Sequence, residues 1–177
     1  MKARLFYQLS ITLLLTIVLL VVVVYLAGNN SFPTNLSKLK AVNMSLLWDY
    51  YQENIRGNLF AGLIAVGGFL MTGKTFILVT MKKNVFDDHD YIDNFKKLSK
   101  FDSSLKRYSP LIQLKDILYV AVYTTIVSAI VQLTVGLIPH WIMALFSIFC
   151  ALLSIVLVID SLNLIKRNLD CWLNEKR

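Results

Sequence analysis

The chain has 177 residues, of which 56% are hydrophobic, and it carries a net charge of +7. Its mean hydropathy of +0.61 lies well above the usual balance of a soluble globular domain and favours a membrane protein. Four stretches of 23 residues or more are apolar and contain only two charged residues, Lys74 and Asp160. A helix of about 20 apolar residues crosses a bilayer.

We therefore predict an all-α integral membrane protein of one domain, residues 1–177, with four transmembrane helices. The predicted spans are 5–28, 57–81, 117–139 and 141–165. They are separated by an outer loop at 29–56 and a cytoplasmic loop at 82–116, and a cytoplasmic tail follows at 166–177.

The basic residues are unevenly distributed around these spans. Fourteen Lys and Arg residues lie in the N-terminus, the 82–116 loop and the tail, whereas three lie in the 29–56 loop. Because Lys and Arg are enriched on the cytoplasmic side, both termini are predicted to be cytoplasmic, in a bacterial inner membrane. The net positive charge is then explained mostly by the topology and by attraction to anionic lipids. No motif supports direct nucleic-acid binding, and none is expected.

The first span is almost wholly Leu, Ile and Val, and we expect it to face lipid. In the following outer loop, apolar residues recur at helical spacing, at Leu36, Leu39, Val42, Leu46 and Tyr50. Trp48, Tyr50 and Tyr51 carry amphipathic rings that favour the headgroup layer. The pattern predicts a helix lying on the outer leaflet, or alternatively a surface that senses an external signal or caps an oligomer.

The cytoplasmic loop contains a second amphipathic pattern. Apolar residues recur every three or four positions from Tyr91 to Leu105, with aspartates before them and lysines after them. This order suits a helix dipole and predicts a cytoplasmic helix that packs under its own spans or receives a partner. The candidate partner surface comprises Tyr91, Phe95, Lys96, Lys97 and Lys100. Asp87, Asp88, His89 and Asp90 indicate helix capping rather than a metal site, and Ser109 with Pro110 indicates the start of the next helix.

Small or mildly polar residues form stripes on three spans, a pattern that lets membrane helices approach closely. Span two carries Gly57, Ala61, Ala65, Gly68 and Thr72; span three carries Thr124, Ser128, Gln132 and Gly136; span four carries Ser147, Ala151, Ser154 and Ser161. Spans three and four are joined by a tight hairpin turn. The stripes predict packing in the bundle or in an oligomer, or alternatively a water-filled path.

Residues Gly68 to Thr75, GFLMTGKT, match the phosphate-binding loop pattern, and IVLVID at 155–160 resembles the strand that accompanies such loops. The variable positions are bulky and apolar, and the run continues directly into span two, so a span is the better interpretation. Lys74 then lies about 12 Å from Lys82, and Asp160 about 9 Å from Lys166. We expect Lys74 and Asp160 to pair, or Lys74 to extend its amine to the headgroups.

No catalytic constellation, cofactor motif or metal-ligand spacing is present in the sequence, and we expect neither an enzyme nor a bound cofactor. In size, span number, N-in topology and basic cytoplasmic loop, the chain resembles the four-span membrane subunit of the two-component Kiwa antiphage defence system. Our leading hypothesis is a homo-oligomeric membrane protein whose cytoplasmic loop and tail hold or control a soluble partner. The resemblance implies that it senses a membrane disturbance during phage attachment and relays it inward, as a family member accompanied by a soluble DNA-binding subunit. An oligomeric pore that depolarises the membrane and an immunity protein against a pore-forming toxin are the alternatives.

Overall fold

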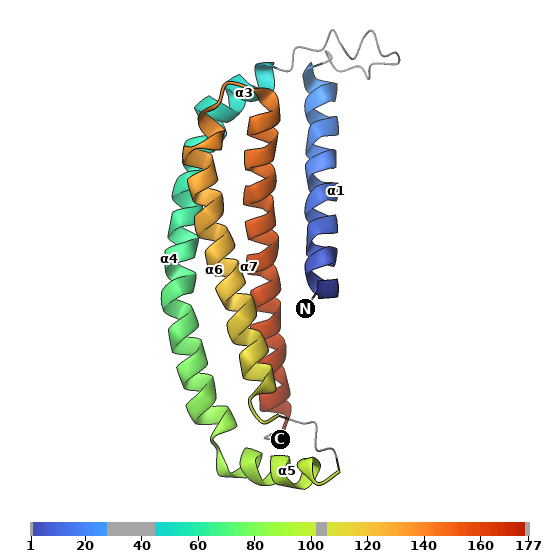
Figure 1. The fold of residues 1–177 in the computed structure, drawn as a ribbon, viewed down its shortest axis with the longest axis vertical. Helices are drawn as coiled ribbons and strands as arrows, with labels where there is room; N and C mark the ends of the chain where they lie inside the picture. Colours follow the sequence, from blue (N-terminus) through green and yellow to red (C-terminus); the bar gives the residue numbers. More distant parts are fainter. Residues whose placement is uncertain (1, 28–44, 102–105, 176–177) are drawn as a thin grey trace. The chain divides into compact units, whose positions relative to one another are not determined.

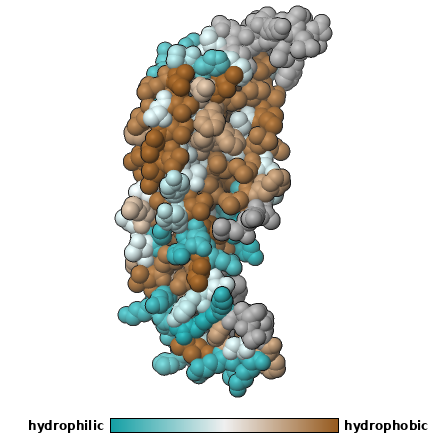
Figure 2. Space-filling view, viewed as in Figure 1, coloured by the Kyte–Doolittle hydropathy of each residue, from teal (hydrophilic) through white to brown (hydrophobic). Residues whose placement is uncertain are grey.

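The computed structural model describes residues 2–27, 45–101 and 106–175, and these residues contain helices and turns but no strand (Figure 1). Four helical segments are long and apolar enough to cross a membrane: Arg4–Tyr25, Leu47–Phe86, Ser109–Leu137 and Trp141–Arg167. The predicted all-α class and the four candidate spans are thereby confirmed. On the face shown in Figure 2, hydrophobic residues predominate along the upper part of the long helices, and hydrophilic residues are most concentrated around the short helix α5.

In chain order the described elements are α1 (Lys2–Ala27), α3 (Ser45–Tyr50), the π-helical turn η1 (Tyr51–Ile55), α4 (Arg56–Met81), the π-helical turn η2 (Lys82–Phe86), α5 (His89–Ser99), α6 (Ser109–Leu133), the 3₁₀ turn η3 (Val135–Leu137) and α7 (Trp141–Glu175). Helix α6 begins at Ser109, as the Ser-Pro pair predicts. Helix α7 has 35 residues and is therefore about 52 Å long.

The contacts divide the chain into two compact units. Unit 1 comprises 1–66 and 124–156, and unit 2 comprises 67–123 and 157–177. Helices α4, α6 and α7 each contribute a segment to both units. Each unit has its own buried core and is described separately.

The core of unit 1 combines alanines with a few larger side chains, among them the ring of Tyr51. Tyr51, Ala144 and Ile148 form one cluster, against which Leu19 of α1 and Trp48 pack. Leu63, Ala129 and Ala151 form a second cluster from α4, α6 and α7. Alanines at these positions permit the close helix approach that the small-residue stripes predict.

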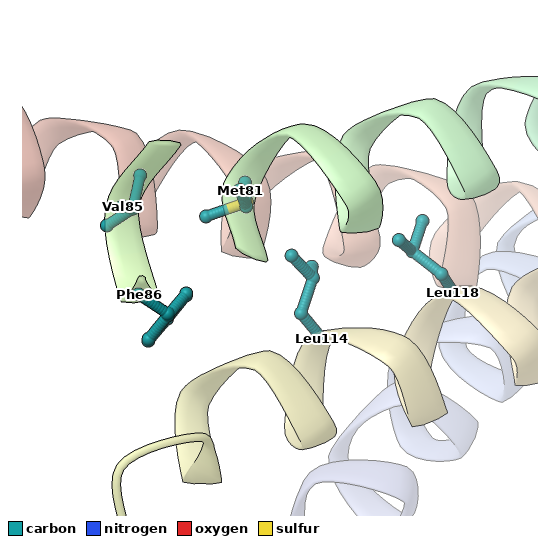
Figure 3. Packing of buried hydrophobic residues seen from close by; sticks show 5 residues of the cluster. All are labelled: Met81, Val85, Phe86, Leu114 and Leu118. Atoms are coloured by element: carbon teal, nitrogen blue, oxygen red, sulfur yellow. The ribbon is translucent and has the colours of Figure 1, made fainter. Parts of the chain in front are cut away.

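The core of unit 2 is aliphatic and aromatic. Met81, Val85 and Phe86, at the end of α4 and in η2, face Leu114 and Leu118 of α6 (Figure 3). The rings of Tyr91 and Tyr108 pack at the edge of this cluster. The core therefore anchors both ends of the 82–116 loop.

The GFLMTGKT segment lies entirely within helix α4, and IVLVID lies within helix α7. A phosphate-binding loop requires a strand, a loop with free backbone N–H groups and a following helix. Here those N–H groups belong to a continuous helix. The fold thus agrees with the interpretation of this segment as part of a span.

Helix α1 differs from the prediction of a helix without a polar stripe. Gln8, Thr12 and Thr16 are spaced by four residues and are buried, with 4%, 0% and 7% of their surface exposed. The two threonine hydroxyls donate to the carbonyls four residues earlier, at 2.9 and 2.8 Å, so their polar atoms are satisfied within the helix. The remaining faces of α1 are exposed and apolar, as expected of a lipid-facing helix.

Most of the predicted outer helix, including Leu36, Leu39 and Val42, lies outside the described residues. Its described end, α3, continues through η1 into α4. Tyr51 was predicted at the headgroup layer but is fully buried, whereas Tyr50 is 61% exposed. Burial of Tyr51 is possible because its hydroxyl finds a polar partner in the core, as shown below.

The Tyr51 ring explains the glycine at position 136. Gly136 is buried in η3, and a methyl group there would overlap the Tyr51 hydroxyl. By contrast, a methyl group at Gly62 on α4 would touch nothing within 4 Å. Position 136 therefore has no room for a side chain, whereas position 62 does.

We predict that Gly136→Ala lowers the free energy of unfolding by about 1–3 kcal/mol, because overpacking forces Tyr51 to move. The matched control, Gly62→Ala, should be neutral or stabilising by up to about 1 kcal/mol, because alanine is the better helix former. The measurement is thermal unfolding in detergent by circular dichroism. Equal melting temperatures for the two variants would contradict the close packing of Tyr51 on Gly136.

Candidate functional site

A buried polar network joins three helical segments of unit 1. The Tyr51 hydroxyl donates to Gln132 Oε1 at 2.5 Å, and Gln132 Nε2 donates to the Ser147 carbonyl at 2.8 Å. Tyr51 and Gln132 are both fully buried. One amide thus connects η1, α6 and α7, and uses its acceptor and a donor within the chain.

A second polar contact joins α6 to α7 one turn further along. Ser128 Oγ donates to the Cys150 carbonyl at 2.8 Å, and Ser154 Oγ lies 2.6 Å from Ser128 Oγ. Ser154 Oγ also lies 2.8 Å from the same carbonyl, so its single proton has two alternative acceptors, that carbonyl and Ser128 Oγ. We call the side chains of Tyr51, Gln132, Ser128 and Ser154 the polar seam.

The seam contains three of the predicted stripe residues, Ser128 and Gln132 of span three and Ser154 of span four, and their contacts join α6 to α7 within the chain. Of the two adjacent threonines in span three, Thr125 is fully buried, whereas the predicted stripe residue Thr124 is half-buried. The span-four residues Ser147, Ala151, Ser154 and Ser161 are buried. These stripes therefore serve packing inside one chain.

The stripe on α4 is arranged differently. Gly57, Ala61 and Ala65 in unit 1 are exposed, and so is Gly68 in unit 2. A methyl group at Gly57 or Gly68 would touch nothing within 4 Å. The described part of the chain leaves this stripe uncovered, and its role as an oligomer contact stays a prediction.

Lys74 has an aromatic partner that the sequence reasoning missed. In unit 2 its amine lies 4.9 Å from the centroid of the Tyr119 ring, which stacks on Tyr123. The ring face attracts a cation, and this attraction is stronger away from water. Spacing along the chain carries no signal for this pair, because Tyr119 lies in another span. Asp160 is half-buried in the same unit, and its pairing with Lys74 stays a prediction.

We expect Lys74→Met and Tyr119→Leu to be coupled by about 0.5–2 kcal/mol in a double-mutant cycle, because each change removes the same cation–π contact. The same cycle with Asp160→Leu tests the predicted ion pair. The readout is thermal unfolding in detergent, and Phe76→Leu on the exposed face of α4 is the control. Strictly additive effects of Lys74→Met and Tyr119→Leu would contradict the cation–π contact.

A charged cluster holds the two ends of the 82–116 loop together. Asp87, which follows η2, accepts hydrogen bonds from the Tyr108 hydroxyl at 2.7 Å and from the Arg107 guanidinium. Arg107 also lies over the Tyr108 ring, 4.4 Å from its centroid. Tyr91 of α5 donates to the Arg107 carbonyl at 3.4 Å. We call Asp87, Arg107 and Tyr108 the clasp.

The clasp shifts the pKa of two of its members. The hydrogen bond from Tyr108 and the nearby Arg107 guanidinium hold the pKa of Asp87 below its ordinary value. The same hydrogen bond raises the pKa of Tyr108, because the carboxylate favours the protonated phenol. At neutral pH the cluster is therefore in its fully bonded form, with an ionised carboxylate and a neutral phenol.

The clasp holds α5 in place. On α5 and in the turn that follows it, some side chains are packed and others are exposed. Tyr91 of the predicted partner surface packs on the unit 2 core, and Phe95 is half-buried. Lys96 pairs with Asp93 at 3.3 Å on the surface, and Lys97 and Lys100 are exposed. Two large apolar residues outside the predicted set, Leu98 and Phe101, are 58% and 91% exposed. The sequence pattern contained both, but it left open whether the apolar face packs under the spans or receives a partner.

We predict that Asp87→Asn speeds amide hydrogen exchange in α5 several-fold, because Arg107 and Tyr108 lose their shared acceptor. Because the folded-state pKa of Asp87 is lowered, its contribution is present above its ordinary pKa of about 4 and disappears as the pH falls through the lowered value. The difference between wild type and variant should therefore be equal at pH 6 and pH 8.

Asp93→Asn is the control, since Asp93 contacts only exposed Lys96. Unchanged exchange in Asp87→Asn would contradict the role of the clasp.

The described residues contain no group of three or more His, Cys, Asp or Glu side chains arranged to hold a metal ion. No model of a known protein family matches the chain, and neither a curated protein nor a solved structure is detectably similar to it.

Proposed function

We propose that the chain is an oligomeric bacterial inner-membrane protein that senses membrane disturbance and controls a soluble cytoplasmic partner, in the setting of antiphage defence. Both termini and the 82–116 loop lie in the cytoplasm in this proposal, as the distribution of Lys and Arg favours. The observation that carries it is helix α5. The clasp and the unit 2 core hold this helix, and it still presents exposed apolar and basic side chains.

The partner surface in this proposal is centred on Leu98 and Phe101, with Lys97 and Lys100 beside them. Exposed aromatic and aliphatic side chains surrounded by charge are typical of protein–protein contacts. Tyr91, by contrast, stabilises the loop itself. The soluble partner should therefore present an apolar patch with acidic residues around it.

Oligomerisation in this proposal uses the α4 stripe. Gly57, Ala61 and Ala65 are exposed on a helix that is apolar enough to span a bilayer, and small residues permit close contact between such helices. A second copy of the chain is the simplest occupant of this stripe.

The test is affinity purification of the tagged full chain from its native host in mild detergent, with measurement of mass and identification of bound proteins. We expect an oligomer with one soluble protein in constant ratio. A Leu98→Ser/Phe101→Ser variant should lose that protein and keep the oligomer. The control, Lys83→Gln/Lys106→Gln, changes the same loop outside α5 and should keep both.

A monomer without any partner would overturn the proposal. Retention of the soluble protein by the Leu98→Ser/Phe101→Ser variant would remove α5 as its binding surface.

The pore is the second candidate, and the observation that favours it is Lys74 inside a candidate span. The stripe of span three gives it less support, because Ser128 and Gln132 are buried in contacts with α7. A pore predicts that overexpression collapses the membrane potential in wild type but not in Lys74→Met. An unchanged potential in wild type would rule it out.

A further inference from the structure

A groove lies between α4 and α6 in unit 2, near the end of both helices that adjoins the 82–116 loop. It has a volume of about 240 Å³ and is lined by Leu78, Val79, Lys82, Leu111, Ile112 and Lys115. Four aliphatic side chains and two lysine stems form its walls. It is open along one side, so it suits a flexible chain lying lengthwise better than a compact soluble ligand, whose pockets usually enclose about 300–1,000 Å³.

The lysines occupy regular positions on the two helices. Lys74 and Leu78 of α4 and Lys82, the first residue of η2, are spaced by four residues, and on α6 the same spacing holds for Leu111, Lys115 and Tyr119. The helices run in opposite directions, and the contact between Lys74 and Tyr119 fixes their register. This register places Lys82 beside Leu111 and Lys115 beside Leu78. The groove is thus lined by aliphatic side chains, with Lys82 at its loop end and Lys115 one helical turn, about 6 Å, further from the loop.

We propose that this groove binds one acyl chain of an anionic phospholipid of the cytoplasmic leaflet, whose phosphate lies between the amines of Lys82 and Lys115. The inference rests on the membrane insertion and topology of the proposed function, but not on the soluble partner. Lysine stems pack on hydrocarbon while their amines reach the headgroup layer, so both parts of the lipid meet matching chemistry. A phospholipid satisfies the apolar walls and the charges together.

The local charge favours a net anionic headgroup. Lys115 contacts Asp116 at 3.2 Å on the exposed surface, which leaves the site with one excess positive charge from Lys82. A zwitterionic headgroup would bring a second cation next to the lysines. An anionic headgroup, such as that of phosphatidylglycerol, brings none.

A lipid bound at this position would influence the clasp. Lys82 begins η2, and its carbonyl accepts a hydrogen bond from the Asp87 amide at 2.9 Å. A lipid phosphate on the Lys82 amine therefore acts five residues before the carboxylate that holds Arg107 and Tyr108. Loss of the lipid would change the charge next to the clasp, which gives the membrane a direct route to α5.

The test uses the purified, delipidated full chain in mild detergent, titrated with dioleoyl phosphatidylglycerol or dioleoyl phosphatidylcholine and followed by native mass spectrometry. We expect the phosphatidylglycerol to bind more tightly. Each lysine near an anionic surface contributes about 1 kcal/mol, which corresponds to about a fivefold change in affinity. Lys82→Gln/Lys115→Gln should therefore weaken binding roughly 25-fold if the two contributions add.

Three further variants distinguish binding in the groove from general attraction of the lipid to positive charge on the protein. Lys83→Gln/Lys106→Gln removes two positive charges from the same loop outside the groove, and its affinity should stay within about twofold of wild type. Lys82→Arg/Lys115→Arg keeps both charges and should keep binding. Val79→Trp fills the groove, leaves the lysines in place and should weaken binding. Circular dichroism on each variant verifies that it is folded.

Equal binding of the two lipids, or equal losses in the groove variant and the Lys83/Lys106 control, would overturn the proposal. Displacement of phosphatidylglycerol by millimolar inorganic phosphate, beyond that by chloride at equal ionic strength, would show a free-anion site and overturn it as well. The assay requires no partner protein. Failure to capture a partner therefore leaves this inference standing, and failure of lipid selectivity leaves the proposed partner surface standing.

Discussion

The amide of Gln132 is the contact on which the packing of unit 1 depends. Its oxygen accepts the Tyr51 hydroxyl and its nitrogen donates to the Ser147 carbonyl, so three helical segments share one side chain. In a hydrocarbon solvent apolar side chains gain nothing by leaving lipid for one another, and helices associate through shape and polar contacts instead. The alanines at 129, 144 and 151 then let α6 and α7 approach closely enough for the serine hydroxyls to meet. Gly136 completes the arrangement, because only a residue without a side chain fits beneath Tyr51.

Unit 2 is held by different forces. Its core consists of large aliphatic and aromatic side chains, and its polar contacts are charged and lie at the surface. The clasp is partly exposed to solvent and is therefore screened, whereas the polar seam of unit 1 is buried and is not. Changes of salt or pH should thus weaken the contacts of the loop and α5 under milder conditions than those of the seam.

The long apolar stretches predicted the four candidate spans because hydropathy over 20 residues is a strong signal. Helix α5 was predicted because its acids precede its lysines. The inward side of each helix was harder to predict. Tyr51 and Tyr50 are chemically equivalent neighbours, and only a partner 81 positions away, Gln132, decides which ring is buried. The sequence analysis did not predict the buried stripe of Gln8, Thr12 and Thr16. A threonine whose hydroxyl bonds to its own helix behaves almost like an apolar residue, so it gives little sign of which side faces inward. The contact of Lys74 with Tyr119 joins different helices, so no local pattern records it.

The length of α7 has a mechanical consequence. Its apolar part, Trp141–Arg167, has 27 residues and measures about 40 Å, whereas the hydrocarbon core of a typical bilayer is about 30 Å thick. A span longer than the membrane tilts, bends or thickens the lipid around it. Because the helix continues unbroken to Glu175, any tilt displaces its far end sideways in proportion to its length. In the membrane insertion proposed above, the position of this helix end would therefore depend on bilayer thickness, and this dependence requires no ligand.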